Sequence, residues 1–494
     1  MRTSAPKVAS GQDVTVEDAR SFKELKETPL YADRVPIYPK SVRGLFRRIK
    51  WAVLILLLGL YYIVPWIRWD RGPTAPDQAV LVDMPGRRLY FFWIEIWPQE
   101  IYYLTFLLIA AAFGLFLATA IGGRVWCGFT CPQTVWTDLF MGVERMIQGD
   151  RGARIRLDKQ PWTSEKLWKK GATHAAWLLI AAATGGAWIM YFNDAPTVTY
   201  DILTGSAGLA VYFFFGLFTF TTYLLAGWAR EQVCTYMCPW PRIQAALLDQ
   251  DSYVVTYETW RGEPKGPHKK GASWEGRGDC VACNQCVAVC PMGIDIRDGL
   301  QLECIGCGLC VDACNEVMTR VDRPLNLITL DTERNQLNRA AGKPTESRLV
   351  RTRTIVYVAI LAVLGIGVLL GLSGRVGLDL NVLPDRNPLF VKLGDGSIRN
   401  GYTVKVLNRV REPKTYALTL EGLEGATLSV LGLNEGNGPS AVLDGKPDQV
   451  STYRLFVTAP PGSAGDAVND IRVILTDQAD NEAYGFDTVF RGPK

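Results

Sequence analysis

Five long apolar segments lie between residues 49 and 373 and set the predicted architecture of the chain. Each has roughly the 20 residues that an α-helix needs to cross the hydrocarbon core of a bilayer. The segments are residues 49–67, 101–120, 174–192, 208–228 and 354–373. The pattern therefore predicts a multi-domain membrane protein built around a bundle of five transmembrane helices.

After residue 380 the pattern changes to short runs in which apolar and polar residues alternate, such as YTVKVLN, TYRLFVTA and DIRVILTD. Gly, Pro, Asn and Asp fall between these runs. Alternation with a period of two is typical of strands that have one buried face, and regular turn signals between them are typical of a sandwich. We therefore expect residues 380–494 to form a β-sandwich of about seven strands.

Basic residues near the ends of the spans predict how the bundle is oriented. Segment 121–173 is rich in Lys and Arg, whereas segment 193–207 has only two charged residues, both Asp. Because cytoplasmic segments carry the excess of Lys and Arg, we expect the N-terminal tail and segments 121–173 and 229–353 in the cytoplasm. Segment 68–100 opposes the rule with four Arg. Because the chain changes sides at each of the five spans, a cytoplasmic N-terminus still places segment 68–100 and the C-terminal domain on the periplasmic side. The tail is predicted to cover residues 1–48.

Composition is that of a mixed membrane and soluble protein. Hydrophobic residues make up 48% of the 494 residues, and the formal net charge is only +4. So small a charge gives no support to a nucleic-acid partner. The two histidines are His174 and His268, and His268 lies in a polar segment. A transmembrane haem held by two imidazoles is therefore not expected.

Eight of the twelve cysteines lie between residues 280 and 314 and form the strongest motif in the chain. They make two runs of C-x2-C-x2-C-x3-C, the spacing of bacterial ferredoxins with two [4Fe–4S] clusters, in which the fourth cysteine of each run binds the other cluster. Structural zinc, the alternative, seldom needs two overlapping sets of four. We expect cluster 1 on Cys280, Cys283, Cys286 and Cys314, and cluster 2 on Cys304, Cys307, Cys310 and Cys290.

These clusters move single electrons, so the segment between the fourth and fifth spans is predicted to be an electron relay. We expect a ferredoxin-like domain at residues 275–325. It is flanked by residues 229–274 on one side and by a linker, residues 326–353, on the other.

The remaining four cysteines form two C-x3-C-P motifs, WCGFTCPQ and VCTYMCPW, each at the end of a span. Pro132 and Pro239 suit the first turn of a following amphipathic helix that lies along the membrane surface. A thiol just before a helix N-terminus is expected to have a lowered pKa. If the second and fourth spans are neighbours, the motifs form one four-thiol site from Cys127, Cys131, Cys234 and Cys238.

The spacing alone does not decide what this four-thiol site does. It could hold a third [4Fe–4S] cluster, bind copper through soft thiolates that favour Cu(I), or cycle between dithiols and disulfides. Buried apolar cysteines without a function are the remaining alternative. His174 begins the third span on the same side and is a candidate copper ligand. Arg124 and Arg230 lie beside the motifs and either keep thiolates ionised or only mark the cytoplasmic boundary.

Several segments together carry a resemblance to a known family. They are RVPIYPKSVRGLFRRIKW, WPQEIYYL, VWCGFTCPQTVWTDLF, CTYMCPW, GIDIRDGLQLECIGCGLC and SIRNGYTVKVLNR. Over nearly its whole length the chain resembles the CcoG/FixG/RdxA proteins, cytochrome c oxidase accessory proteins of bacterial inner membranes. The resemblance implies five spans, cytoplasmic [4Fe–4S] clusters and an immunoglobulin-like periplasmic domain. It also implies a role in maturation of the cbb3-type oxidase, by reduction of Cu(II) to Cu(I).

The leading hypothesis is therefore a membrane-bound iron–sulfur oxidoreductase that reduces Cu(II) for oxidase assembly, with copper handled at or beside the four-thiol site. Its expected partners are cbb3-type oxidase subunits or assembly factors, a copper chaperone or importer, and an electron donor whose identity stays open. One alternative is an electron-transfer module of the quinol dehydrogenase type. The other is a redox-sensing assembly scaffold that docks a partner through the C-terminal domain.

Overall fold

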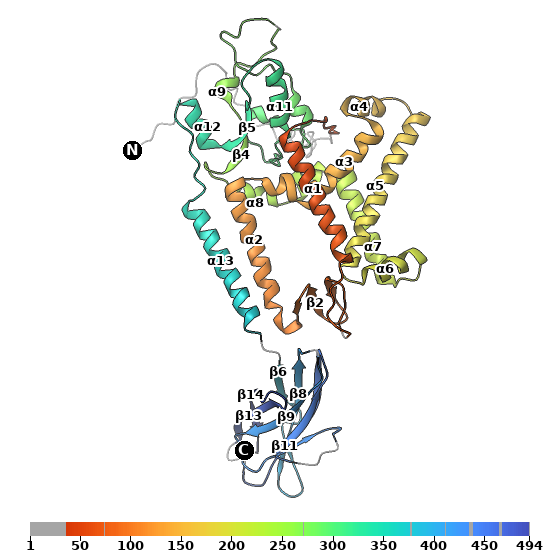
Figure 1. The fold of residues 1–494 in the computed structure, drawn as a ribbon, viewed down its shortest axis with the longest axis vertical. Coiled ribbons are helices and arrows are strands. Elements are labelled where there is room, and N and C mark those ends of the chain that lie inside the picture. The colour runs from red at the N-terminus through yellow and green to blue at the C-terminus, as the bar shows by residue number, and fades with distance from the viewer. Residues whose placement is uncertain are drawn as a thin grey trace, which may run out of the picture.

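The computed structural model describes residues 36–73, 75–269, 271–375, 378–410, 412–433, 438–463 and 467–493. Most of the predicted N-terminal tail, residues 1–35, lies outside the described residues. The cysteine-rich insert lies at one end of the molecule, the long helices in the middle, and the β-sandwich at the other end (Figure 1). We call the end of the helices next to the insert the insert face and the other end the sandwich face.

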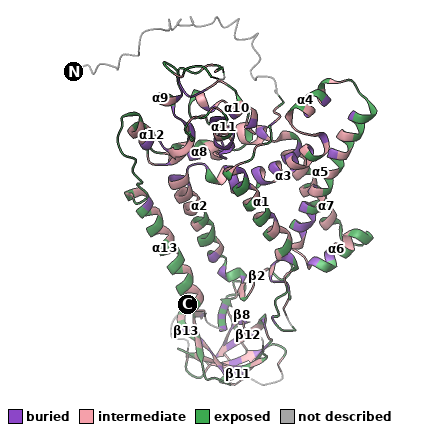
Figure 2. Cartoon of the chain, turned by 45° about the horizontal axis from the view of Figure 1, so that its top comes forward, coloured by how far each residue is buried: buried purple, intermediate pink, exposed green. Residues whose placement is uncertain are grey.

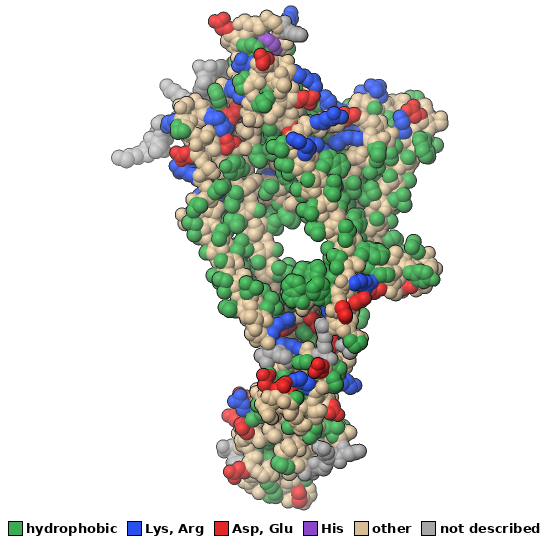
Figure 3. Space-filling model, viewed as in Figure 1, with side chains coloured by type: hydrophobic (Ala, Val, Ile, Leu, Met, Phe, Trp, Pro, Cys, Tyr) green, Lys and Arg blue, Asp and Glu red, His purple; other side chains and the backbone are tan. Residues whose placement is uncertain are grey.

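In the described part of the chain, five helices are long and apolar enough to cross a membrane, which confirms the predicted five-helix bundle. They are α1 (Leu45–Ile63), α2 (Tyr102–Gly122), α5 (Ser164–Met190), α7 (Leu209–Thr222) and α13 (Thr352–Ser373). A π-helical segment, Tyr223–Ala229, extends α7 to a full span. Hydrophobic side chains cover the middle of the molecule, whereas charged side chains gather toward its two ends (Figure 3). This is the distribution that a bilayer favours.

The spans form two groups. In the most apolar stretch of α5, 44% of the residues are buried, against none in α13, so α5 is the more closely packed helix and α13 the more exposed one (Figure 2). At Gly185 of α5, a Cβ atom would lie 2.7 Å from the Thr219 hydroxyl oxygen of α7. Small residues of this kind let membrane helices approach closely. α2 packs against α13 instead, and Figure 3 shows an opening between the two groups, edged by hydrophobic side chains.

Segment 68–100, expected only as a loop, contains a three-stranded antiparallel sheet at the sandwich face. Its strands are β1 (Val80–Asp83), β2 (Arg88–Phe91) and β3 (Ile94–Ile96). Arg68 forms ion pairs with Asp77 and Asp194, each at 2.6 Å. The buried Arg71 donates hydrogen bonds to backbone carbonyls, including that of Phe92 at 2.9 Å. These arginines oppose the charge rule because they have specific partners in the folded protein.

Two buried ionic clusters hold the β-sandwich against the spans. Arg88 of β2 pairs with Glu95 at 2.8 Å and with Asp448 of the sandwich at 2.6 Å. The Glu100 side chain, only 3% exposed, pairs with Arg375 just after α13 and lies 3.6 Å from Arg409 of the sandwich. The C-terminal domain is therefore docked on the bundle through charged contacts with little access to water.

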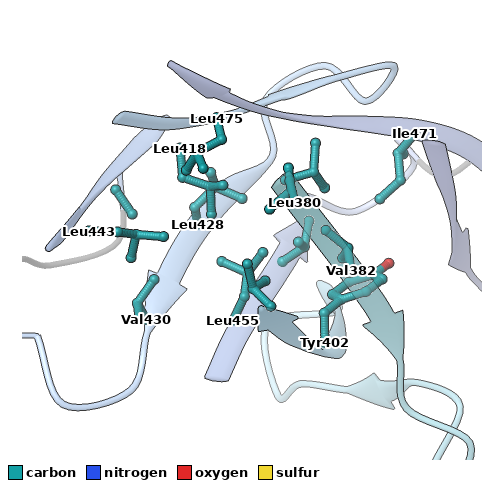
Figure 4. Packing of buried hydrophobic residues seen from close by; sticks show 14 of the residues in the cluster. Leu380, Val382, Tyr402, Leu418, Leu428, Val430, Leu443, Leu455, Ile471 and Leu475 are labelled. Atoms are coloured by element: carbon teal, nitrogen blue, oxygen red, sulfur yellow. The ribbon is translucent and has the colours of Figure 1, made fainter. Parts of the chain in front are cut away.

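The C-terminal domain is a sandwich of two antiparallel sheets, which confirms the predicted β-sandwich. One sheet has the order β10–β12–β8–β6, with β7 paired to β8, and the other has the order β11–β9–β13–β14. Its strands are β6 (Leu378–Pro384), β7 (Val391–Lys392), β8 (Ile398–Asn408), β9 (Lys414–Glu421), β10 (Thr427–Val430), β11 (Ser440–Gly445), β12 (Gln449–Ala459), β13 (Val468–Asp477) and β14 (Ala483–Arg491). The alternating residues of both sheets meet in one apolar core (Figure 4). The described residues of this domain form nine strands rather than about seven, and the shortest of them, β7 and β10, have only two and four residues.

The insert is closed by a pair of antiparallel strands, β4 (Tyr253–Tyr257) and β5 (Ile328–Thr332). Between them lie the eight clustered cysteines. The insert also caps the first span, because the carboxylate of Asp312 accepts hydrogen bonds from the backbone N–H groups of Phe46 at 3.2 Å and Arg47 at 2.8 Å. These N–H groups have no partner within the helix itself. A negative charge at a helix N-terminus is also favourable. The insert and the bundle are therefore joined at this helix end.

Replacing Glu100 with Gln is expected to loosen the docked sandwich. Removing one partner of a buried ion pair costs about 3–5 kcal/mol, because the other charge is left buried without compensation. We expect faster proteolytic release of the C-terminal domain from the membrane-embedded protein, measured as the rate at which the fragment appears. The control is Asp480→Asn, which removes a carboxylate that is 58% exposed and shares Lys414 with Asp477. Equal release rates for both variants would contradict the proposed docking role.

Candidate iron–sulfur and four-thiol sites

The two ferredoxin-type runs have the same backbone shape. The residues before and after the second cysteine of each run have positive φ: 52° at Ala282, 54° at Asn284, 69° at Gly306 and 71° at Gly308. Helices then begin at equivalent places, α10 (Gln285–Val289) and α11 (Leu309–Arg320). Turns with left-handed residues direct successive N–H groups toward one concave side, where they can bind anionic atoms. Both loops are therefore suited to hold the sulfurs of a cluster.

The fourth cysteine of each run lies near cysteines of the other run. The charges that act on Cys314 are those of Cys286, Cys280 and Cys283 in the first run. The charges that act on Cys290 are those of Cys307 and Cys304 in the second run. The structure therefore brings together the two predicted sets, Cys280/Cys283/Cys286/Cys314 and Cys290/Cys304/Cys307/Cys310.

The surroundings of the second set fit an iron–sulfur cluster. A cavity is lined by all four of its cysteines and by apolar side chains such as Val255 and Ile294. Burial raises the pKa of the Cys290 thiol to about 12. Free thiols there favour the protonated form, so a positively charged iron core would stabilise the thiolates that ligation requires.

The first set has a more polar environment. Cys283 is exposed, whereas Cys280 is buried and lies near the polar groups of Tyr257 and Arg297. Cluster 1 would therefore lie nearer to solvent than cluster 2, with polar groups beside one of its ligand sulfurs, and both features tune a reduction potential.

Each C-x3-C motif forms a π-helical turn, and the two turns are alike. They cover Trp126–Thr130 and Val233–Met237. Cys131 N donates to Trp126 O at 2.8 Å, and Cys238 N donates to Val233 O at 2.8 Å. These are i→i+5 bonds, which close a wider turn than an α-helix does. The first cysteine of each motif lies within the π-helical turn, and the second lies directly after it.

The two motifs are halves of an internal repeat. Four residues before the first cysteine of each motif, the preceding helix ends at a residue with positive φ, 60° at Gly123 and 42° at Arg230. At Gly123, a Cβ atom would lie 2.2 Å from the carbonyl oxygen of Tyr253, so this position requires glycine. The turns lead into α3 (Pro132–Gln148) and α8 (Trp240–Leu247), which agrees with the helices predicted after each Cys-Pro.

The structure brings the four thiols of these motifs together at the insert face. The charges acting on Cys127 include those of Cys131, Cys234 and Cys238. Burial raises the pKa of Cys127 to about 12 and that of Cys234 to about 11. The helix-dipole argument for a lowered pKa therefore does not hold for these two thiols, which lie four residues before the thiols next to the helix N-termini.

The four-thiol site lies directly against the loop of cluster 2. At Gly128, a Cβ atom would lie 2.9 Å from Ile305 O and 3.1 Å from Cys307 Cα. Cys127 also packs against the buried group that contains Cys307. The backbone of the first C-x3-C turn therefore touches the backbone that carries a predicted cluster ligand. The sequence did not predict this contact. The only indication of it is Gly128 between the two cysteines, because a residue without a side chain allows two backbones to approach closely.

The arginines beside the two motifs have different partners. Arg124 donates hydrogen bonds to Leu302 O, to Cys304 O at 2.8 Å and to Pro241 O at 3.1 Å. Arg230 instead pairs with Glu144 at 3.0 Å and packs over the Trp177 ring. Arg124 therefore faces the cysteine loops, while the charge of Arg230 is matched by a carboxylate.

His174 is placed with aromatic residues. Its Nδ1 lies 2.9 Å from the Tyr223 hydroxyl oxygen, and its ring meets that of Trp177 edge-on. The charged groups that act on it are Lys170, Glu144 and Arg230, and no cysteine is among them. Its role as a copper ligand stays a prediction without a supporting contact.

Within the described residues, no group of three or more His, Cys, Asp or Glu side chains is arranged to hold a single metal ion. An iron–sulfur cluster is larger than one ion, because each of its corner irons takes its own thiolate. The thiol spacing of the two ferredoxin-type sets is therefore compatible with clusters.

Fold and site together define a membrane-spanning iron–sulfur electron-transfer protein. The family described as a 4Fe-4S dicluster domain matches residues 229–333, and a 4Fe-4S binding domain matches residues 104–150, which include the first C-x3-C-P motif. The Ig-like fold at the C-terminal of FixG matches residues 368–493.

Curated relatives match almost end to end. The nitrogen fixation protein FixG of Rhizobium meliloti is 49% identical over 493 residues, covering 94% of each chain. Protein RdxA of Cereibacter sphaeroides is 48% identical, covering 91% of this chain and 95% of its own length. A crystal structure of a FixG-related protein from Vibrio parahaemolyticus is 24% identical, with a TM-score of 0.21, and covers 24% of this chain and 100% of its own. The chain belongs to the FixG/RdxA family.

Single cysteine substitutions can test the crossed ligation. We expect Cys280→Ser and Cys314→Ser to lose the same paramagnetic signal, because both thiols would bind cluster 1. Cys304→Ser and Cys290→Ser should lose the other signal. The measurement is electron paramagnetic resonance of the reduced protein, with iron and acid-labile sulfide falling by about half in each variant. If Cys290→Ser removed the same signal as Cys280→Ser, the assignment would be wrong.

Replacing Gly128 with Ala is expected to separate the first C-x3-C turn from the insert. Overpacking of this kind typically costs about 1–3 kcal/mol. We expect a lower Tm of the cluster-loaded protein and faster loss of iron to a chelator. The control is Gly171→Ala in α5, where a Cβ atom meets nothing within 4 Å. There the change should be neutral or stabilising by up to about 1 kcal/mol.

Proposed function

We propose that this protein carries electrons through cluster 1 and cluster 2 to the four-thiol site, where Cu(II) is reduced to Cu(I) for loading of a cbb3-type oxidase. Each turnover consumes one electron from the reduced protein and converts one Cu(II) into one Cu(I). The single observation that supports this route is the backbone contact between Gly128 and the loop Ile305–Cys307. It leaves little distance between the second cysteine set and the four thiols.

The residues of the four-thiol site suit copper as a substrate. Thiolate is a soft ligand that favours Cu(I) over harder ions. Cys238 is exposed, whereas Cys127, Cys131 and Cys234 are partly buried, so an ion arriving from solvent would meet Cys238 first. Gln244 accepts a hydrogen bond from the Cys127 thiol at 3.0 Å and fixes its direction.

The eight ferredoxin-type cysteines would hold the two clusters, which supply single electrons when bound. The exposed Cys283 makes the first set the natural point of entry for an electron donor. The second set, closer to the membrane helices, lies between the first set and the four thiols.

The excess of Lys and Arg on the insert side supports a cytoplasmic insert and a periplasmic sandwich in a bacterial inner membrane. In this orientation copper is reduced on the cytoplasmic side. Oxidase subunits or assembly factors and a copper chaperone or importer are the partners that this role requires.

The proposal predicts that substitution of all four thiols by Ser abolishes copper reduction and leaves the clusters in place. Anaerobically reduced protein is mixed with Cu(II), and Cu(I) is recorded with a specific chelator. We expect the rate to fall at least about tenfold, equivalent to about 1.4 kcal/mol or more. The paired variants Cys127→Ser/Cys131→Ser and Cys234→Ser/Cys238→Ser should each be as slow as the quadruple variant, because both halves build one site.

Undiminished copper reduction by the quadruple variant with intact clusters would sink this role of the four thiols. Reduction of the clusters by a quinol in membrane vesicles, without copper reduction, would favour the quinol dehydrogenase alternative. Iron counting identifies the content of the four-thiol site. About eight irons per chain leave the thiols free for copper, whereas about twelve indicate a third cluster.

A further inference from the structure

Arg124 connects the three cysteine-bearing segments of the protein. It lies three residues before Cys127 and donates hydrogen bonds to the carbonyls of Leu302 and Cys304 in the cluster 2 loop. Its other terminal nitrogen donates to Pro241 O at 3.1 Å, just beyond the second C-x3-C-P motif. One guanidinium group thus holds both halves of the four-thiol site and the insert.

This guanidinium is buried without a carboxylate partner. Arg124 is only 6% exposed, and no ion pair is recorded for it among the described residues. Its Nε is buried and has no hydrogen-bond partner there. Carbonyl oxygens satisfy some of its donors but do not neutralise its charge. A buried charge without compensation is strongly unfavourable, so a nearby negative group is required.

The acidic groups near Arg124 are two cysteines of the candidate sites and one carboxylate. The charges that act on Arg124 are, in decreasing order, Cys304, Cys127 and Glu303. Cys304 belongs to the cluster 2 set and Cys127 to the four-thiol site. An iron–sulfur core held by four thiolates carries a net negative charge, which grows by one when an electron arrives. A fixed cation beside it stabilises the reduced form and raises its reduction potential.

We propose that Arg124 is the shared counter-cation of cluster 2 and the four-thiol site, and that its charge makes electron flow from cluster 1 toward the membrane favourable. The direction of flow rests on the proposed function, whereas the effect on cluster 2 does not. Arg124 acts through the cysteines and is a positioning and electrostatic residue.

The protein supplies a matched control at cluster 1. Arg297 lies near Cys280 and Cys286 of the first set. Its ion pair with Asp295 distinguishes it from Arg124, whose charge has no carboxylate partner in the described residues. The two arginines therefore serve different clusters and can be changed independently.

The test is a redox titration of the full-length, cluster-loaded protein by electron paramagnetic resonance. In Arg124→Gln, cluster 2 should become harder to reduce than in the parent, while cluster 1 changes little. We expect at least a tenfold change in the distribution of one electron between the clusters, which equals about 59 mV for a one-electron couple. Arg297→Gln should shift cluster 1 and leave cluster 2 unchanged.

The variant Arg124→Lys distinguishes the effect of the positive charge from the effect of the hydrogen bonds that Arg124 donates. Lysine keeps the positive charge but lacks the planar fork that reaches three carbonyls. The potential of cluster 2 should therefore return toward the parent value, while hydrogen exchange of residues 300–306 should rise as it does in Arg124→Gln. An unchanged cluster 2 potential in Arg124→Gln, or equal shifts of both clusters, would overturn the proposal. A selective shift without any copper reduction by the parent protein would uphold it and reject the proposed function.

Discussion

The close contact between two backbones at Gly128 is the constraint on which the arrangement of redox sites depends. It joins a turn at the end of a membrane span to the loop that carries Cys304 and Cys307. Any side chain at this position would force the insert away from the membrane. The capping of α1 by Asp312 and the hydrogen bonds of Arg124 act at the same boundary. Together they fix the insert to the end of the bundle.

Both outer cysteine pairs, which are spaced one residue wider than ordinary metal motifs, lie on π-helical turns. In these turns the backbone hydrogen bond spans five residues. π-Helical turns are rare and are often found at functional sites. The following proline ends the turn cleanly, because it has no N–H group to continue the hydrogen-bond pattern.

The sequence alone predicted those parts of the fold that depend on one local property of the chain. Apolar length predicted the five spans, and alternation predicted the sandwich, whereas the division of the eight cysteines between two clusters stays a prediction. The sequence did not predict contacts between residues that lie far apart in the chain. The arginines of segment 68–100 seemed to violate the charge rule because residues such as Asp194 and Asp448 were not known to be their partners. Arg124 and Arg230 looked equivalent, and only the fold separated the arginine facing the cysteine loops from the one matched by Glu144.

The internal repeat has a consequence for how such a site can be assembled. Each half contributes one membrane span, one turn and two thiols, so neither half can complete a set of four alone. A shorter chain with only one half would obtain the full set by pairing with a second copy of itself across a two-fold axis. In this chain the halves have diverged, with Gly123 facing the insert where the other half has Arg230. Because Gly123 lies against Tyr253 of the insert, the two sides of the four-thiol site have different neighbours and are not equivalent.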